Sequence, residues 1–241
     1  MVKLFLGTSG WSYNGWIGDF YPEDIDRREM LSFYTRHFNS VEVNATFYRL
    51  PFKNMIKGWY ADAPKEFEFA VKGHRRVTHY NKLEDVHDTI TDQMERIDVL
   101  SEHLGPVLWQ LPPSLHKNVE RLERFIALLP DNMRHAIEFR HPSWLDQAVF
   151  RLLEKRNIAQ VWVSSEQMPA ETTETADFIY LRFHGLNTGY RYDYSREELE
   201  AWADRIQQVY EHGKTVYAYF NNDYACYAPR NAKMLRNMIY I

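Results

Sequence analysis

At residues 179–184 the chain reads Ile179-Tyr180-Leu181-Arg182-Phe183-His184, a short apolar and aromatic run that ends in polar side chains. This pattern is typical of a buried strand with a polar carboxyl end. Similar runs occur at residues 4–9, 41–44, 67–72, 107–110, 136–140, 161–164 and 216–221. Eight strands in 241 residues leave about 30 residues for each strand and its crossover, the length of a βα unit. The sequence therefore predicts a (β/α)8 barrel of the TIM type, with parallel strands and a site at their carboxyl ends.

The segments between these runs change to a helical period, with one exception. Residues 86–103 carry apolar side chains every three to four positions, which predicts a surface helix packed on the strands. Further helices are predicted at residues 28–37, 53–62, 119–129, 143–155 and 196–212, with a last one starting near residues 229–232. Ser195 and Glu198 fit a capping box. Residues 167–177 are short of helix formers and contain Pro169, so the helix after the sixth strand is expected to be degenerate.

Composition limits the class of protein. With 45% hydrophobic and 15% aromatic residues the chain can bury a large core, and we expect one domain over residues 1–241. A net charge of −4 gives no overall attraction to nucleic acid or to an anionic membrane. The apolar start is too short for a signal peptide, and no run approaches the ~20 apolar residues of a membrane span. The single Cys226 allows no internal disulfide, so we expect a cytoplasmic protein without a membrane partner.

Alternation along the strands predicts which polar side chains share a face, because residues i and i+2 point the same way. The apolar side chains of Val43, Phe139 and Phe183 should face the helices, so the polar residues beside them should face the interior or its mouth. This inward set comprises Glu42, Asn44, Lys72, Gln110, Glu138, Arg140, Arg182 and His184. Buried charges are costly unless they are paired, so these groups must neutralise one another or meet solvent and ligand.

Two interpretations of this polar set remain open. In the first, it is a structural network that closes the top of the barrel. In the second, Glu42 and Glu138 are acid and base groups of a substrate site, and His184 carries a proton. Lys72, Arg140 and Arg182 would then hold an anionic group of the substrate, since cationic side chains outnumber carboxylates in the set.

A metal site is a further alternative. Glu42, Glu138, His141 and His184 resemble an oxygen and nitrogen ligand set for a divalent ion. Arginines alternate with these residues along the same strands, however, and would repel a cation, and the chain has no His-Glu-x-x-His spacing. We therefore expect no obligatory cofactor, and a divalent metal belongs to the alternative only.

Two other clusters could contribute to ligand binding. Asn221 and Asn222 follow the last strand, and Asn231 lies near the expected start of the final helix, where barrels commonly bind phosphate. The alternative is an asparagine-rich turn with a helix cap. Trp11 and Tyr48 offer aromatic surfaces that suit stacking on a sugar or a base, or else serve only to pack loops.

Several longer motifs resemble the signature blocks of the YecE-like family, domain of unknown function 72. They are Gly7-Thr8-Ser9-Gly10-Trp11, Val41-Glu42-Val43-Asn44-Ala45-Thr46-Phe47-Tyr48, Lys72 with Thr78-His79, Leu108-Trp109-Gln110-Leu111-Pro112-Pro113, Glu138-Phe139-Arg140-His141-Pro142-Ser143-Trp144, Arg182-Phe183-His184-Gly185 and Tyr219-Phe220-Asn221-Asn222-Asp223. The resemblance runs almost end to end and implies a (β/α)8-type barrel with a pocket at the carboxyl ends of the strands. It implies no particular reaction.

The leading hypothesis is a hydrolase or lyase that acts on an anionic or phosphorylated small molecule. Its catalytic residues would be Glu42, Glu138 and His184. Its substrate-binding residues would be Trp11, Asn44, Tyr48, Lys72, Gln110, Arg140, His141, Arg182, Asn221, Asn222 and Asn231. The first alternative is a metal-dependent, endonuclease-like phosphodiesterase or nucleic-acid binder, which the net charge does not favour. The second is a regulatory barrel that binds a metabolite without turnover.

Overall fold

Parallel strands form the centre of the molecule. A computed structural model describes residues 3–240 of the chain. Its strands are β1 (Leu4–Thr8), β2 (Ser40–Val43), β3 (Glu68–Lys72), β4 (Leu104–Gln110), β5 (His135–Glu138), β6 (Ala159–Gln160), β7 (Trp162–Ser165), β8 (Phe178–Gly185) and β9 (Thr215–Phe220). They pair in two sheets of order β1-β9-β8-β7 and β2-β3-β4-β5-β6, and every pairing is parallel. All eight runs predicted as strands are confirmed.

The two sheets meet at two seams, and neither seam is a full strand pairing. On one side β6 pairs with β5 and β7 pairs with β8, so the extended segment 159–165 serves both sheets in turn. On the other side β1 and β2 are joined by a single parallel bridge between Ser9 and Glu42, where the backbone N–H of Gly10 donates to the carbonyl oxygen of Glu42 at 2.7 Å. The prediction is therefore confirmed as a parallel α/β fold in two sheets, and a continuous closed sheet is not present in residues 3–240.

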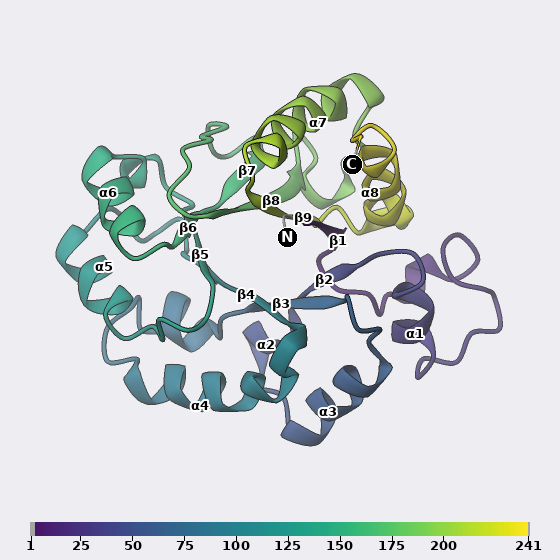
Figure 1. The fold of residues 1–241 in the computed structure, drawn as a ribbon, viewed down its shortest axis with the longest axis horizontal. Helices are drawn as coiled ribbons and strands as arrows, with labels where there is room; N and C mark the ends of the chain where they lie inside the picture. Colours follow the sequence, from purple (N-terminus) through teal and green to yellow (C-terminus); the bar gives the residue numbers. More distant parts are fainter. Residues whose placement is uncertain (1–2, 241) are drawn as a thin grey trace.

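Helices lie around the outside of the strands (Figure 1). They are α1 (Met30–Tyr34), α2 (Ala45–Tyr48), α3 (Lys53–Asp62), α4 (His87–Ile97), α5 (Val119–Ile126), α6 (Gln147–Lys155), α7 (Arg196–Glu211) and α8 (Tyr227–Arg236). The capping box of Ser195 and Glu198 at the start of α7 is confirmed. Residues 167–177 contain no helix, as predicted. None of the helices in residues 3–240 has the length and apolar character needed to cross a membrane.

The predicted helix ends differ from the observed ones where a helical pattern continues into a tighter turn. The helix predicted over residues 86–103 stops at Ile97, and a 3-10 segment, Asp98–His103, completes it. The last helix begins at Tyr227, so the expectation of a start near residues 229–232 was wrong. Asn231 consequently lies inside α8 and not in its first turn, where free backbone N–H groups are found.

Apolar side chains fill both faces of the strands. Val43, Phe139 and Phe183 are buried in the larger cluster between strands and helices, as the alternation predicts. A second cluster lies on the other face of the strands, where Phe5 stacks on Tyr217 with ring centroids 4.8 Å apart. Burying one such side chain stabilises the fold by about 1.5–3 kcal/mol. The polar residues of β2, β5 and β8 lie next to this second cluster, at the carboxyl ends of the strands.

Candidate functional site

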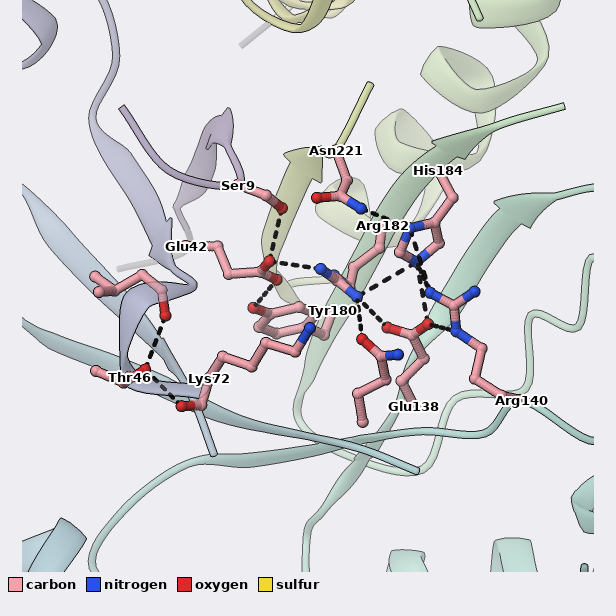
Figure 2. A network of polar contacts seen from close by, with 12 residues as sticks. Ser9, Glu42, Thr46, Lys72, Glu138, Arg140, Tyr180, Arg182, His184 and Asn221 are labelled. Carbon is pink, nitrogen blue, oxygen red and sulfur yellow. Dashed lines mark hydrogen bonds and ion pairs between the residues drawn. The ribbon is translucent and has the colours of Figure 1, made fainter. Parts of the chain in front are cut away.

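Arg182 lies at the centre of a buried polar network (Figure 2). Its Nη2 donates to Glu42 Oε1 at 2.7 Å, and its Nη1 donates to Glu138 Oε2 at 2.5 Å. The Arg182 side chain is 1% exposed and both glutamates are 0% exposed. Arg182 is on β8 of one sheet, whereas Glu42 is on β2 and Glu138 on β5 of the other. One guanidinium therefore pairs with two carboxylates and ties the two sheets together.

Glu42 is an ionised carboxylate with a donor on each oxygen. Ser9 Oγ donates to Oε1 at 2.6 Å and Tyr180 Oη donates to Oε2 at 2.8 Å, in addition to the bond from Arg182. Burial opposes the charge, but Arg182 and Lys72 outweigh burial and hold the pKa of Glu42 below its usual value. At neutral pH this group can accept a proton but has none to donate.

Glu138 is held in the same way by a different set of partners. Arg140 Nε forms an ion pair with Oε1, and Nε2 of His184 lies 3.0 Å from the same oxygen. Burial again opposes the charge, but Arg140 and Arg182 hold the pKa of Glu138 well below its usual value. Both carboxylates predicted from the sequence are therefore ionised and fully engaged with neighbours.

His184 lies at the carboxyl end of β8 and is only 8% exposed. Its Nε2 is 3.0 Å from Glu138 Oε1 and 2.9 Å from Arg140 Nη2, so a carboxylate and a guanidinium compete for this nitrogen. Its Nδ1 is 3.1 Å from Asn221 Nδ2. Burial, with Arg182 and Arg140 acting in the same direction, lowers the pKa of His184 to about 4. The imidazole is therefore neutral at pH 7, with one nitrogen protonated and one able to accept a proton.

Lys72 ends β3, and its backbone is fixed from two sides. Its carbonyl oxygen accepts hydrogen bonds from Thr46 Oγ1 at 2.6 Å and from Gln93 Nε2 at 3.1 Å. Its ammonium lies over the ring of Phe47, 4.5 Å from the centroid. Within residues 3–240 the Nζ atom makes no hydrogen bond or ion pair, unlike the two arginines of the network.

The surroundings of Lys72 weaken its hold on a proton. Burial lowers the pKa of Lys72 to about 8, and Arg182 acts in the same direction, while Glu42 and Glu138 act against both. Figure 2 shows the side chain extending from β3 toward the space between the two glutamates. A substantial fraction of this lysine is thus a neutral amine near physiological pH.

The structure brings together most of the inward set predicted by strand alternation. Gln110 joins it because its Oε1 lies 3.3 Å from Arg182 Nη1, and Asn221 joins it through His184. We call this network, together with the Lys72 side chain that extends toward it, the Arg182 cluster. Its members are Ser9, Glu42, Lys72, Gln110, Glu138, Arg140, Tyr180, Arg182, His184 and Asn221.

Asn44 and Trp11 lie beside the Arg182 cluster in a separate groove. β2 ends at Val43 and Asn44 has a helical backbone, so the strand alternation that placed Asn44 beside Glu42 stops there. Both residues line a groove of about 360 Å³, where Trp11 packs edge-on against Trp59 with centroids 5.6 Å apart. Tyr48 is exposed on α2, with the guanidinium of Arg75 over its ring.

The remaining predicted residues have partners in surface loops. His141 stacks on His116 with centroids 3.9 Å apart, and its Nδ1 is 2.8 Å from Ser143 Oγ. Asn222 and Asn231 are buried and bonded to each other at 2.7 Å. Asn222 Nδ2 also donates to a backbone oxygen of the loop between β8 and α7, and Asn231 bonds to the same loop. In residues 3–240 these amides fasten a loop, which corresponds to the alternative interpretation of the asparagine cluster.

The residues proposed as a metal ligand set are not arranged as one. Within the described chain, residues 3–240, no group of three or more His, Cys, Asp or Glu side chains is placed to hold a metal ion. The guanidinium of Arg182 occupies the position between Glu42 and Glu138. His141 faces His116 instead of these carboxylates.

Comparisons with known proteins place the chain in a family. A family model described as "Protein of unknown function DUF72" matches residues 5–241. The chain belongs to the DUF72 family. The UPF0759 protein YunF of Bacillus subtilis (strain 168) is 26% identical over 99% of this chain and 95% of its own length. The UPF0759 protein YecE of Escherichia coli (strain K12) is 27% identical over 69% of this chain and 61% of its own length. The family resemblance seen in the sequence motifs is therefore confirmed.

Solved structures of DUF72 family proteins share the fold. A crystal structure from Thermotoga maritima MSB8 has a TM-score of 0.89 and 30% identity, and the match covers 98% of each chain. One from Enterococcus faecalis V583 has a TM-score of 0.85 at 20% identity and covers 100% of this chain and 96% of its own, which supports the fold alone.

Two members of the Arg182 cluster in this DUF72 chain were not predicted from the sequence. Ser9 and Tyr180 both donate to Glu42, yet neither carries a charge that draws attention in a sequence. The alternation of side chains along a strand could have predicted both, because residues an even number of positions apart share a face. Tyr180 precedes Arg182 by two residues, and Ser9 follows the inward-facing Phe5 by four. Parity applied along the whole of each strand, and not only at its charged end, would have found both.

Proposed function

We propose that the Arg182 cluster is the ligand site of an enzyme, a hydrolase or lyase, that acts on an anionic small molecule. The observation that carries this proposal is a charge imbalance. Three cationic side chains, Lys72, Arg140 and Arg182, meet two carboxylates, Glu42 and Glu138, which leaves one positive charge in excess. The two carboxylates already have donors from Arg182, Arg140, Ser9, Tyr180 and the histidine, so the uncompensated cation is Lys72. An anionic ligand would complete the pairing.

The exposed edge of the cluster supplies groups that can hold such a ligand. The Arg140 side chain is 14% exposed and commits its Nε to Glu138, which leaves guanidinium N–H groups for an anion. Asn221, after the end of β9, adds an amide. These groups lie at the carboxyl ends of parallel strands, the position at which ligands bind in parallel α/β folds.

Within this proposal the buried and half-buried members have different tasks. Glu42 fixes Arg182, and the carboxylate of Glu138 orients His184 and can act as a base. His184 is neutral at pH 7, because its pKa is lowered to about 4, and has a nitrogen able to take a proton from substrate. The lowered pKa values of the Glu42 and Glu138 carboxyls leave them no proton to donate at this pH, so a proton donor must be sought in Lys72 or in the ligand.

We also infer that the two sheets are parts of one (β/α)8-type barrel. Two features support this architecture: segment 159–165 pairs with β5 and then with β8, and the Ser9–Glu42 bridge lies between β1 and β2. The Arg182 cluster also joins the two sheets, because Arg182 on β8 bonds to Glu42 on β2 and to Glu138 on β5. In a barrel of this kind the cluster would occupy the mouth.

Ligand binding to the native state provides the test, because such binding raises the free energy of unfolding by RT ln(1 + [L]/Kd), about 2.7 kcal/mol at 100 Kd. We expect sulfate, phosphate or phosphorylated sugars to raise the melting temperature of the wild-type protein. Arg140→Met should weaken this binding about tenfold or more, in line with the loss of a charge-assisted hydrogen bond. Arg205→Met is the matched control, because Arg205 packs on the ring of Trp202 on α7.

Three results are informative. Stabilisation by an anion that depends on Arg140 but not on Arg205 supports the site. Stabilisation without turnover of any ligand supports the regulatory alternative and overturns the enzymatic part. No stabilisation by any anion overturns the proposal as a whole.

A further inference from the structure

Lys72 differs from an ordinary surface lysine because hydrogen bonds fix its backbone, whereas its side-chain amine has no hydrogen-bond partner in residues 3–240. The backbone carbonyl is bonded by Thr46 and Gln93 at the end of β3. The Nζ atom has no hydrogen-bond or ion-pair partner in residues 3–240, although charged side chains of the Arg182 cluster surround it. A fixed backbone and an amine without a hydrogen-bond or ion-pair partner suit a reactive lysine.

On the side away from these charges, an aromatic ring and a neutral imidazole lie near the amine. Phe47 presents the face of its ring at 4.5 Å from Nζ. His79 packs edge-on against this ring, with centroids 4.9 Å apart. His79 belongs to a single π-helical turn, Arg76–Tyr80, a form that frequently occurs at functional sites. Burial, with Lys72 and Arg140 acting in the same direction, lowers the pKa of His79, so this imidazole is neutral and able to carry a proton.

We propose that the Lys72 amine forms an imine with the carbonyl carbon of a small carbonyl compound that also bears an anionic group. This inference rests on the proposed function, since it names the substrate class of the same site. The anionic group would pair with Arg140 at the exposed edge of the cluster, whose charge also acts on Lys72, and the carbonyl carbon would lie at the Lys72 amine. The cluster contains the two features that such a substrate needs, an amine without a hydrogen-bond partner at Lys72 and guanidinium N–H groups of Arg140 that its pairing with Glu138 leaves free.

The reaction balances without any further reagent. The nitrogen lone pair of the neutral amine attacks the carbonyl carbon, an N–C bond forms, and the carbonyl oxygen takes up a proton. The nitrogen loses a proton, which His79 can carry, and the hydroxyl leaves as water when it is protonated in turn. In sum, one carbonyl compound, one neutral amine and one proton give one protonated imine and one water molecule. The resulting iminium draws electrons from the neighbouring carbon, which favours breaking of a bond at that carbon, the chemistry of a lyase.

The neutral amine is what makes attack feasible near pH 7 to 8. An ordinary lysine, with a pKa near 10.4, is less than about 1% neutral at pH 8. The pKa of Lys72 is lowered to about 8 by burial and by Arg182, so that about half of it is neutral at that pH. The fraction of reactive amine is therefore about 100-fold greater than in an ordinary lysine. Because nucleophilicity falls as basicity falls, the advantage in rate should be smaller, about tenfold.

Reductive trapping tests the inference. Wild-type protein is incubated at pH 7.5 with pyruvate or glyceraldehyde 3-phosphate and sodium cyanoborohydride, which reduces an imine to a stable secondary amine. Acetone and glyceraldehyde are the matched neutral probes, because each lacks the anionic group. Peptide mass spectrometry then compares labelling of Lys72 with that of Lys233, which also lies over an aromatic ring, Phe20, at 4.9 Å.

We expect at least one anionic probe to label Lys72 about tenfold or more faster than it labels Lys233. The corresponding neutral probe should label Lys72 much more slowly than the anionic probe does. Lys72→Met should abolish this fast labelling and Lys233→Met should leave it unchanged. The comparison of two lysines within the wild-type protein holds even if a Lys72 variant folds poorly.

The outcomes separate this inference from the proposed function. If the anionic probes raise the melting temperature but label Lys72 no faster than Lys233, the imine inference is overturned and the anion site stands. If the probes and inorganic phosphate neither stabilise the protein nor label Lys72 selectively, both are overturned. If neutral and anionic probes label Lys72 equally fast, the reactive amine stands and the anionic substrate class is overturned.

Discussion

Removal of the Arg182 guanidinium is the sharpest perturbation of the network. Arg182→Met keeps an unbranched side chain but leaves Glu42 and Glu138 buried without their shared cation. Each carboxylate keeps other donors, Ser9 and Tyr180 on one side and His184 with its neighbours on the other. Breaking a buried ion pair by removing one partner costs about 3–5 kcal/mol. We therefore expect Arg182→Met to lower the free energy of unfolding by about that amount at pH 8, a large share of the roughly 5–15 kcal/mol typical of a domain.

The loss should depend on pH with a defined sign. In the wild-type protein Arg182 helps to hold the pKa of Glu42 and of Glu138 below their ordinary values, so these groups stabilise the fold above pH 4.5 and cease to do so as the pH falls through their folded pKa values. Without the guanidinium, burial is the largest influence left and acts to raise both pKa values, opposed by Lys72 at Glu42 and by Arg140 at Glu138. Protonation at lower pH then removes the cost of two buried charges. The difference between wild type and Arg182→Met should therefore shrink from pH 8 to pH 5.

Urea denaturation followed by circular dichroism at several pH values between 5 and 8 measures this difference. Arg134→Met is the matched control, because Arg134 also bonds to a strand residue, Tyr217, but is exposed. We expect that control to change the free energy of unfolding by less than about 1 kcal/mol, as is usual for exposed polar contacts. A loss of less than about 1 kcal/mol for Arg182→Met at pH 8, or a loss that stays the same down to pH 5, would refute the reasoning.

Three further predictions concern other parts of the chain. Ser195→Ala removes one half of the capping box with Glu198 and should lower the free energy of unfolding by about 1 kcal/mol in urea denaturation; an unchanged midpoint would contradict it. Gly73→Ala would place a Cβ 2.2 Å from the ring of the buried Trp109 and should cost about 1–3 kcal/mol in the same assay, so wild-type stability in this variant would show that the ring is not held as tightly as the packing indicates. Because the pKa of Lys72 is lowered to about 8, its charge is present below pH 8 and is lost above it, so sulfate affinity measured by calorimetry should fall between pH 7 and pH 9, and a constant affinity would remove Lys72 from the anion site.

Strand alternation predicts the centre of the site because the carboxyl ends of parallel strands converge whatever the details of their pairing. Glu138 with Arg140, and Arg182 with His184, share a face as the period of two requires, and their contacts confirm it. Asn44 marks the limit of this rule. β2 ends one residue earlier, the backbone turns helical, and the period of two no longer applies.

The sequence does not reveal contacts that depend on pairing between distant segments. Residues 161–164 are extended as predicted, but the division of the longer segment 159–165 between two partner strands at Val161 follows from how β5 and β8 approach each other. The sequence pattern places Asn222 and Asn231 beside a helix start, whereas the helix begins at Tyr227 and the two amides bond to each other. A short-range pattern contains no information about such tertiary partners.

The structural and functional interpretations of the polar set apply to different members of it. Arg182, Glu42 and Glu138 are almost fully buried and join β8 of one sheet to β2 and β5 of the other. Such a core of paired charges resists motion, because any movement that separates its members leaves a charge buried and unpaired. Lys72 and His184 lie beside this core, and the pKa of each is lowered. The Lys72 amine has no hydrogen-bond partner in residues 3–240, and a carboxylate and a guanidinium compete for one nitrogen of His184. Such groups suit proton transfer and covalent catalysis. Under the proposed function, the costly buried charges would support the two groups that react with the substrate.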